Sequence, residues 1–202
     1  MNRLRRVPIL FVAIALVAFA ALTPGIAAGQ DVIINEVFYR GFTGDDWVEL
    51  KNVGSSTINV SSWWLCARFT YRPLSGLTNL DGTDLVLSPG EITTVQMNFD
   101  LGGASSDLGL YTSTSFGTPS EMRDFVQWGG SGIGRENVAA AAGLWTAGDF
   151  VLAAKGSQSM AYNGGDPNAS GGYENGPPTR SEENITVPVS ESTWGRVKSL
   201  YQ

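Results

Sequence analysis

The sequence predicts an all-β fold, an antiparallel β-sandwich, on three observations. Short segments with alternating apolar and polar side chains recur along the chain, turns rich in glycine and proline separate them, and 43% of the residues are hydrophobic. A period of two is typical of strands that bury one face, and many short strands at this spacing favour a sandwich. A chain of 202 residues can bury a core without disulfide bonds, and the single cysteine could not form an internal one.

The first part of the chain contains three of these segments. Strands are expected at 32–39 and 47–52, and a reversal at 53–56 leads into a short β-branched strand at 57–60. Alternation and motif positions together select a set of inward-facing side chains. The expected core includes Ile34, Val48, Leu50, Trp63, Leu65 and Leu87.

The segment 63–70 is expected to be one strand with two different faces. Trp63 and Leu65 should point into the core, so Trp64 and Cys66 should point away from it. Trp64 is then either covered by the protein's own loops or part of a surface that contacts a partner or ligand. Cys66 is either an inert thiol or a site of intermolecular pairing.

The second part of the chain is expected to add further strands and one short helical segment. Residues 135–144, RENVAAAAGL, predict a short helical insertion that covers an open end of the sandwich, and 163–178 is expected to be an irregular loop or disordered. The remaining strands are expected at 85–87, 92–99, 108–112, 122–128, 150–153 and 159–162.

Residues 1–29 have the features of an N-terminal signal peptide. Arg3, Arg5 and Arg6 precede an apolar run at 8–22, and small residues follow. A retained membrane anchor is the alternative, but the run is shorter than the roughly 20 residues that a spanning helix needs. We therefore expect cleavage, only transient contact with the membrane, and a mature protein that is secreted or held at the cell surface.

The charge balance argues against nucleic-acid binding. The chain has 13 basic and 19 acidic residues and a net charge of −6; without the three leader arginines, 10 basic residues remain and the net charge is −9. An acidic surface repels phosphate, and nucleic-acid binding normally requires a basic patch. The expected partner is a protein or an extracellular polymer of unknown identity.

No catalytic arrangement stands out, so the chain is not expected to be an enzyme. The absence of histidine excludes Ser-His-Asp and Cys-His nucleophilic sites and histidine-based zinc sites. Glu36 and Glu49 could form the carboxylate pair of a hydrolase if their strands are neighbours. The alternative is that both carboxylates bond to nearby loops or pair with Arg40 and Lys51.

No cofactor is expected, although calcium is the one to consider. Hard oxygen ligands occur on turns at 45–46, at 165–168, and at Asp81 and Asp84, as in extracellular calcium sites. Aspartate, asparagine and glycine also dominate ordinary solvated turns, and no segment matches a complete calcium loop.

The C-terminal tail, 188–202, contains apolar residues at helical spacing and positive charge. Trp194, Val197, Leu200 and Tyr201 recur at helical spacing in this segment. It is either a short helix docked on the sandwich or a frayed tail, or else a tail that an export or attachment system recognises.

Several motifs occur in the order found in one domain family: Ile34-Asn35-Glu36-Val37, Trp47-Val48-Glu49-Leu50, Ser62-Trp63-Trp64-Leu65, Pro89-Gly90-Glu91 and Asp124-Phe125-Val126-Gln127-Trp128-Gly129. Together they resemble the lamin-tail domains of secreted bacterial proteins. The resemblance implies an immunoglobulin-like β-sandwich over residues 30–187 and a role in interaction or structure. It leads us to expect an exported, non-catalytic module; a calcium-assisted carbohydrate- or matrix-binding module is the alternative.

Overall fold

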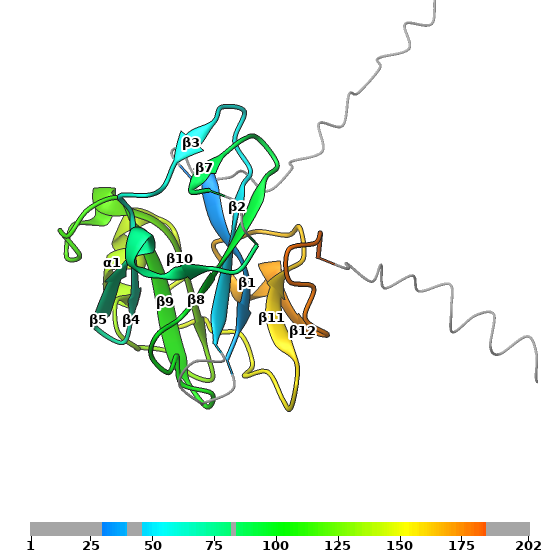
Figure 1. Cartoon of the computed structure of the whole chain (residues 1–202). Coiled ribbons are helices and arrows are strands. Elements are labelled where there is room, and N and C mark those ends of the chain that lie inside the picture. Colours follow the sequence, from blue (N-terminus) through cyan, green and yellow to red (C-terminus); the bar gives the residue numbers. More distant parts are fainter. Residues whose placement is uncertain (1–29, 40–45, 82–83, 185–202) are drawn as a thin grey trace, which may run out of the picture.

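Antiparallel strands form two sheets that face each other across a common core (Figure 1). The computed structural model describes residues 30–39, 46–81 and 84–184. The proposed signal peptide and the whole C-terminal tail, including Trp194, lie outside these residues. The predicted all-β sandwich is confirmed.

The larger sheet has six strands. Their spatial order is β12 (Tyr173–Gly176), β11 (Ser159–Tyr162), β1 (Val32–Phe38), β2 (Trp47–Asn52), β8 (Ile92–Gln96) and β6 (Thr78–Asn79).

The smaller sheet has four strands, and a separate ribbon has two. The four-stranded order is β10 (Met122–Trp128), β9 (Ser106–Tyr111), β4 (Trp64–Ala67) and β5 (Thr70–Pro73), and the ribbon pairs β3 (Ile58–Asn59) with β7 (Val86–Leu87). Along the sequence, successive strand pairs alternate between the two large sheets. The chain therefore crosses repeatedly from one sheet to the other.

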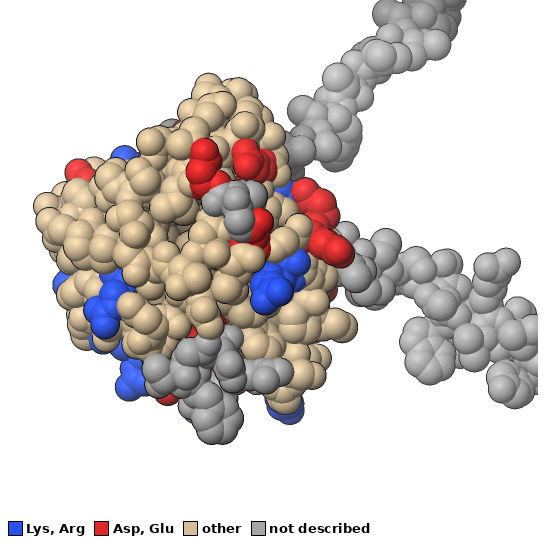
Figure 2. All heavy atoms as spheres, in the orientation of Figure 1, with Lys and Arg blue, Asp and Glu red and all other residues tan. Residues whose placement is uncertain are grey.

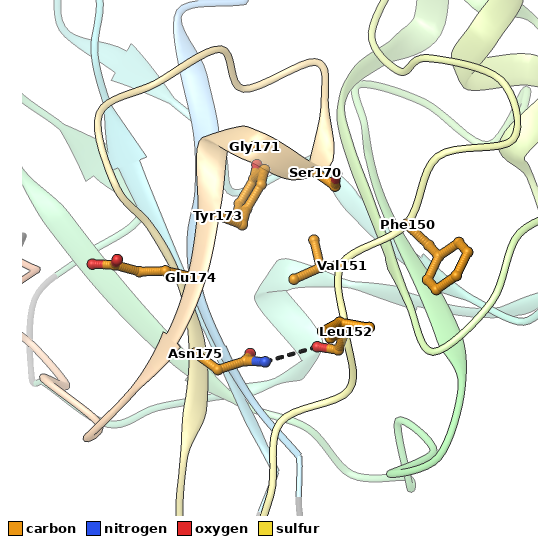
Figure 3. A pocket seen from close by; sticks show the side chains of 8 residues that line it. All are labelled: Phe150, Val151, Leu152, Ser170, Gly171, Tyr173, Glu174 and Asn175. Atoms are coloured by element: carbon orange, nitrogen blue, oxygen red, sulfur yellow. Dashed lines mark hydrogen bonds between the residues drawn. The ribbon is translucent and has the colours of Figure 1, made fainter. Parts of the chain in front are cut away.

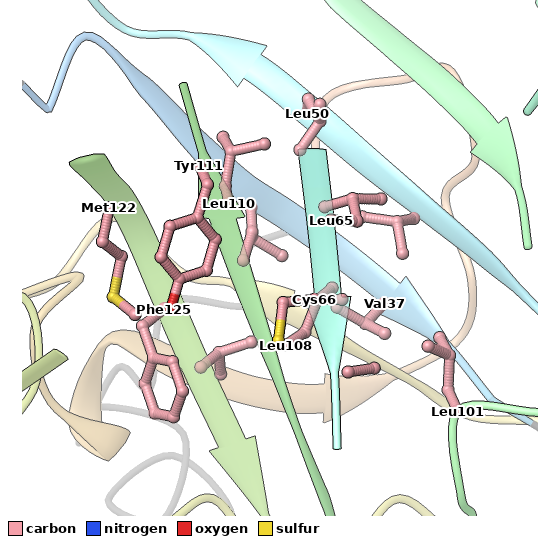
Figure 4. Packing of buried hydrophobic residues seen from close by; sticks show 14 of the residues in the cluster. Val37, Leu50, Leu65, Cys66, Leu101, Leu108, Leu110, Tyr111, Met122 and Phe125 are labelled. Carbon is pink, nitrogen blue, oxygen red and sulfur yellow. The ribbon is translucent and has the colours of Figure 1, made fainter. Parts of the chain in front are cut away.

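Apolar side chains from both sheets fill the space between them (Figure 4). Tyr39 stacks on Trp128 with ring centroids 4.4 Å apart, which joins the end of β1 to the end of β10. Five of the six expected core residues are fully buried: Ile34, Val48, Leu50, Leu65 and Leu87.

A β-bulge in β1 changes which residues face the core. The register shifts between Ile34 and Glu36, so Ile34 and Val37 both point inward and Asn35 is the extra residue. Strict alternation would place Ile34 and Val37 on opposite faces. The bulge therefore decides that Glu36 lies on the outer face of the sheet.

Asp124 connects the two sheets from within the core. It is fully buried, and its carboxylate accepts hydrogen bonds from the Ile34 backbone N–H at 2.5 Å and from Gln30 Nε2 at 2.8 Å. Burial raises the pKa of Asp124 to about 7 because the charged form loses its hydration.

The expected single strand at 63–70 is wrong. Strand β4 ends at Ala67, the chain reverses at Arg68 and Phe69, and β5 begins at Thr70. Trp63 precedes β4 and is only partly buried against the core. Trp63 is not fully buried because it precedes the strand, so the alternation of β4 does not direct its side chain into the core.

The helical insertion, α1 (Glu136–Ala142), covers a sheet face and not an open end of the sandwich. It contacts β10 and the short 3-10 turn η2 (Pro119–Glu121). After the helix, Trp145 packs against Phe125 on the outer face of β10, with ring centroids 5.8 Å apart. The outer face of β10 is therefore packed as well.

The last segments also differ from expectation. The stretch expected to be irregular contains β12 and a 3-10 turn, η3 (Ser170–Gly172), and 150–153 makes only a single parallel bridge, Val151 to Trp128. A third 3-10 turn, η1 (Leu74–Gly76), follows β5. Among the described residues, no helix has the length and apolar character to span a membrane.

Candidate functional site

The structure brings Glu36 and Glu49 together on the outer face of the six-stranded sheet. They are direct cross-strand partners in β1 and β2, and Thr94 of β8 continues the same row. Both glutamates are fully buried although they lie on the outer face. A later segment of the chain must therefore cover them.

Glu36 is held by three groups of its own chain. Its carboxylate accepts hydrogen bonds from Ser159 Oγ, from the Thr179 backbone N–H at 3.1 Å, and from Thr179 Oγ1 at 2.8 Å. Ser159 belongs to β11, the other neighbour of β1, so the carboxylate joins the sheet to the covering segment.

Glu49 has a similar set of donors. It accepts hydrogen bonds from Asn35 Nδ2 at 2.6 Å, from the Ser181 backbone N–H at 2.6 Å and from Thr94 Oγ1 at 3.3 Å. Burial raises the pKa of Glu49 to about 7, and the neighbouring charge of Glu36 adds to the rise while the hydrogen bonds oppose it.

The cover segment, residues 178–184, closes this face. Asn184 donates from Nδ2 to the backbone oxygens of Asn35 at 3.0 Å and Tyr162 at 2.8 Å. Lys51 and Glu183 form an ion pair at 2.5 Å on its outer side. The carboxylate pair is thus sealed by the chain's own polar groups.

A hollow of about 390 Å³ lies beside the cover segment. Trp47 forms its wall with Thr179 and Arg180, and Trp47 stacks on Phe38 at 5.4 Å. Because Glu36 and Glu49 are fully buried, neither carboxylate faces this hollow as an acid or base. Glycoside hydrolysis needs both carboxylates at the sugar.

Asp81 and Asp84, the proposed calcium ligands, support backbone turns. Asp81 accepts hydrogen bonds from the Thr94 backbone N–H at 2.6 Å and from Ser181 Oγ, and Asp84 accepts one from the Val86 backbone N–H at 2.8 Å. Across the described ranges, no three acidic or cysteine side chains converge as a metal site would require.

Trp64 lies on the outer face of the four-stranded sheet and is half-buried. Phe116, from the loop after β9, packs edge-on against it at 5.9 Å and stacks on Tyr71 at 3.9 Å. The thiol of Cys66 on the same face is fully buried, and burial raises its pKa to about 12, so it is unreactive. One loop of the chain itself therefore covers much of this face.

The aromatic side chains that cover this face extend to an exposed and strained turn. Arg68 and Phe69 are the two central residues of the β4–β5 hairpin, with φ values of 46° and 65°. A two-residue hairpin with both φ values positive normally uses Asn-Gly, and each ordinary residue in this conformation costs about 1–2 kcal/mol. The Phe69 side chain is nevertheless 56% exposed.

Arg135 holds the exposed ring from one side. Its guanidinium lies 5.0 Å from the Phe69 ring centroid and 5.9 Å from that of Tyr71, and its Nη2 donates to Tyr71 Oη at 2.6 Å. Phe69, Arg135, Tyr71 and Phe116 thus form a continuous stack.

Asp107 fixes the backbone beneath this stack. Its buried carboxylate accepts hydrogen bonds from the backbone N–H groups of Arg68 at 2.8 Å and Arg135 at 3.0 Å, and burial raises its pKa. Gly134 packs directly on this carboxylate, because a Cβ there would lie 2.2 Å from Asp107 Oδ2. One carboxylate thus ties together two segments distant in sequence.

A second hollow, of about 300 Å³, lies between β12 and the segment after Asp149 (Figure 3). Asn175 Nδ2 donates to the Leu152 backbone oxygen at 2.8 Å across it, while the Leu152 side chain is 75% exposed. Its apolar rim and its few polar groups define no particular ligand.

The Arg68–Phe69 turn and Asp107 were missed from the sequence for a physical reason. The stretch 66–72 has no glycine, asparagine, aspartate or proline, so it carries no turn signal. The apolar residue Phe69 continues the alternation of β4 and conceals the reversal. Asp107 gives no signal either, because its two partners come from segments far away in sequence.

The chain matches no family model, no curated protein and no solved structure.

Proposed function

We propose that this protein is an exported, non-catalytic β-sandwich that serves as an interaction or structural module and binds a protein or a surface polymer. It acts in the secreted fraction or at the cell surface after removal of residues 1–29. Its architecture is immunoglobulin-like and of the lamin-tail type over residues 30–187.

The main support for this proposal is that the carboxylates of Glu36 and Glu49 are both buried and hydrogen-bonded to donors of the chain itself. Both carboxylates are buried, and the cover segment bonds to each of them. Asp107 and Asp124 serve the same purpose elsewhere, since each accepts backbone N–H groups within the fold. Carboxylates used in this way stabilise loops and leave recognition to exposed surfaces.

The lamin-tail assignment is supported by where its motifs lie. Glu36 and Glu49 of the first two motifs pair across β1 and β2, and the third motif leads into β4. Asp124 of a later motif bonds to Ile34 of the first. The motif residues thus contact one another in the core and its covered outer face, as residues that specify a common fold would.

The calcium-assisted alternative has weaker support, because the oxygens of Asp81 and Asp84 already accept backbone hydrogen bonds. Scanning calorimetry with calcium and with a chelator separates the two readings. Our proposal expects the same melting temperature in both. A drop of several degrees on chelation would favour the calcium module, because a ligand that binds only the native state stabilises it.

Hydrolysis assays on ester and polysaccharide substrates test the non-catalytic proposal. We expect no turnover above background for the wild type, and changed stability but no other difference for Glu36→Gln and Glu49→Gln. Turnover that either substitution abolishes, in protein that remains folded, would refute the proposal.

A further inference from the structure

We propose that the outer face of the four-stranded sheet presents a docking surface for an acidic polypeptide segment in which carboxylates flank an apolar side chain. This inference rests on the proposed function as an interaction module and adds the partner's chemistry. The Phe69 surface, as we call it, consists of Trp64, Arg68, Phe69, Tyr71, Phe116 and Arg135.

The first argument is that the exposed ring is held in place by a strained turn. Arg68 and Phe69 both adopt positive φ, where Asn-Gly would fit without strain. Backbone strain of this kind persists where surrounding structure enforces it and is concentrated at functional positions. Here the enforcing contacts are the Asp107 carboxylate and the Arg135 guanidinium.

The second argument is charge. Within the described residues, the only ion pair shorter than 4 Å joins Lys51 to Glu183, so neither Arg68 nor Arg135 has such a carboxylate partner there. Guanidinium groups pair best with carboxylate or phosphate oxygens. Arg135 beside the exposed ring, together with the exposed Arg68 of the same turn, therefore fits an anionic partner.

The position of this surface agrees with that partner. Basic side chains lie over the part of the molecule that carries β4 and β5, whereas the larger acidic clusters lie toward β7 (Figure 2). An acidic chain that approaches this face is attracted to its basic side chains and repelled by its acidic clusters.

The third argument favours a polypeptide over an acidic polysaccharide. The ring of Phe69 offers no hydrogen-bonding group, and the hydroxyl of Tyr71 already accepts from Arg135. The exposed centre of this surface is therefore an apolar ring, on which an apolar side chain can pack. Aromatic residues and arginine are also enriched where proteins bind one another.

The surface is preorganised, which favours binding. Asp107 fixes the backbone of Arg68 and Arg135, and the stack from Phe69 to Phe116 orders the side chains before any partner arrives. Side chains that are already ordered lose less entropy on association.

The test is binding of the full chain to an array of 12-residue peptides that combine Asp or Glu with Leu or Phe. A parallel array carries Lys in place of each acidic residue. We expect binding to members of the acidic array only, and at least tenfold weaker binding when sodium chloride rises from 50 to 500 mM, as roughly expected for exposed charges.

The key variant combines Arg68→Asn with Phe69→Gly. It removes the ring and one charge while supplying the residues that this turn geometry prefers, so it should stay folded. The control combines Leu152→Ser with Lys155→Gln, which removes an exposed apolar side chain and a charge elsewhere. We expect at least tenfold loss of acidic-peptide binding in the first and less than twofold change in the second.

Three results would overturn the inference. The wild type could bind no acidic peptide more tightly than the turn variant does, or the control variant could lose as much binding as the turn variant. The third result is that the wild type binds polygalacturonate through Phe69 and does not bind the peptides. These results are distinct from failure of the proposed function, which would appear as substrate turnover in the hydrolysis assays whether or not peptides bind.

Discussion

On the outer faces of both large sheets, buried carboxylates accept backbone N–H groups, but the two faces differ in how completely they are covered. On the six-stranded sheet, Glu36 and Glu49 accept backbone N–H groups from the cover segment, and both are fully buried. On the four-stranded sheet, Asp107 likewise accepts two backbone N–H groups, but the cover ends at Phe69, which is 56% exposed.

The difference separates groups that close the fold from groups that are available to a partner. The carboxylate pair looks like catalytic chemistry in sequence, yet each acid is occupied by the chain itself. The Arg68–Phe69 turn has no catalytic character, yet it combines strain and exposure with arginines that form no ion pair within 4 Å among the described residues. Recognition should therefore depend on the turn, and stability should depend on the acids.

The largest expected effect is a pH dependence of stability from Glu49 and Asp124. Their pKa values are raised to about 7 in the folded protein, so the folded state binds more protons than the unfolded state between about pH 4 and pH 7. Stability should therefore be highest near pH 4 and fall as the pH rises to about 7, by about 3 kcal/mol for each group.

Urea unfolding between pH 4 and pH 8 measures this dependence. Glu49→Gln should remove about half of the slope, because the amide does not titrate. Stability that rises steadily over the same range would show that ionisation of these acids favours the folded state, against our account.

The next largest effect is expected for Glu49→Ala, which opens the closed face. Asn35 Nδ2 and the Ser181 N–H lose their acceptor, which should lower the free energy of unfolding by about 3 kcal/mol. Glu174→Ala on β12 of the same sheet is the control and should cost less than about 0.5 kcal/mol. Equal costs for the two would mean that Glu49 supports no structure.

Asp107→Ala should lower both the stability of the protein and peptide binding at the Phe69 surface of the four-stranded sheet. Losing the acceptor for Arg68 and Arg135 should cost about 2 kcal/mol and loosen the turn. Peptide binding should then weaken although Asp107 is buried and touches no partner. Unchanged binding would show that the Phe69 surface does not need this support.

The smallest effect is expected for the exposed ion pair of the cover segment. Glu183 is 72% exposed, so Lys51→Met or Glu183→Gln should change the free energy of unfolding by less than about 0.5 kcal/mol. A loss above about 1 kcal/mol in chemical denaturation would mean that the cover is held mainly by this pair and not by the buried glutamates.

Much of the sandwich could be predicted from the sequence, because short apolar and β-branched segments bounded by turn residues indicate strands directly. The strand at 122–128 has the predicted bounds, and so does 159–162. The rest depended on tertiary contacts. The bulge at Asn35 and strand β12 arise from pairing partners that a local pattern does not show.

The candidate surface was predictable only in part. Trp64 was expected on the outer face, where it lies, but its cover by Phe116 comes from a loop far along the chain. The neighbouring turn has residues that oppose its geometry, so local preference indicated a continuous strand. Sequence reasoning fails most readily at such positions, where local preference and tertiary structure disagree.

The most direct test of this account is the free energy of unfolding of the variant that combines Arg68→Asn with Phe69→Gly. If the wild-type turn is strained to present its ring, relief of that strain should outweigh the lost stacking on Arg135 and raise stability by about 1 kcal/mol. Phe69→Ala, which keeps the positive φ but loses the stack, should instead be slightly less stable. A double variant less stable than the wild type would show that the turn residues serve the fold itself, and would contradict the account.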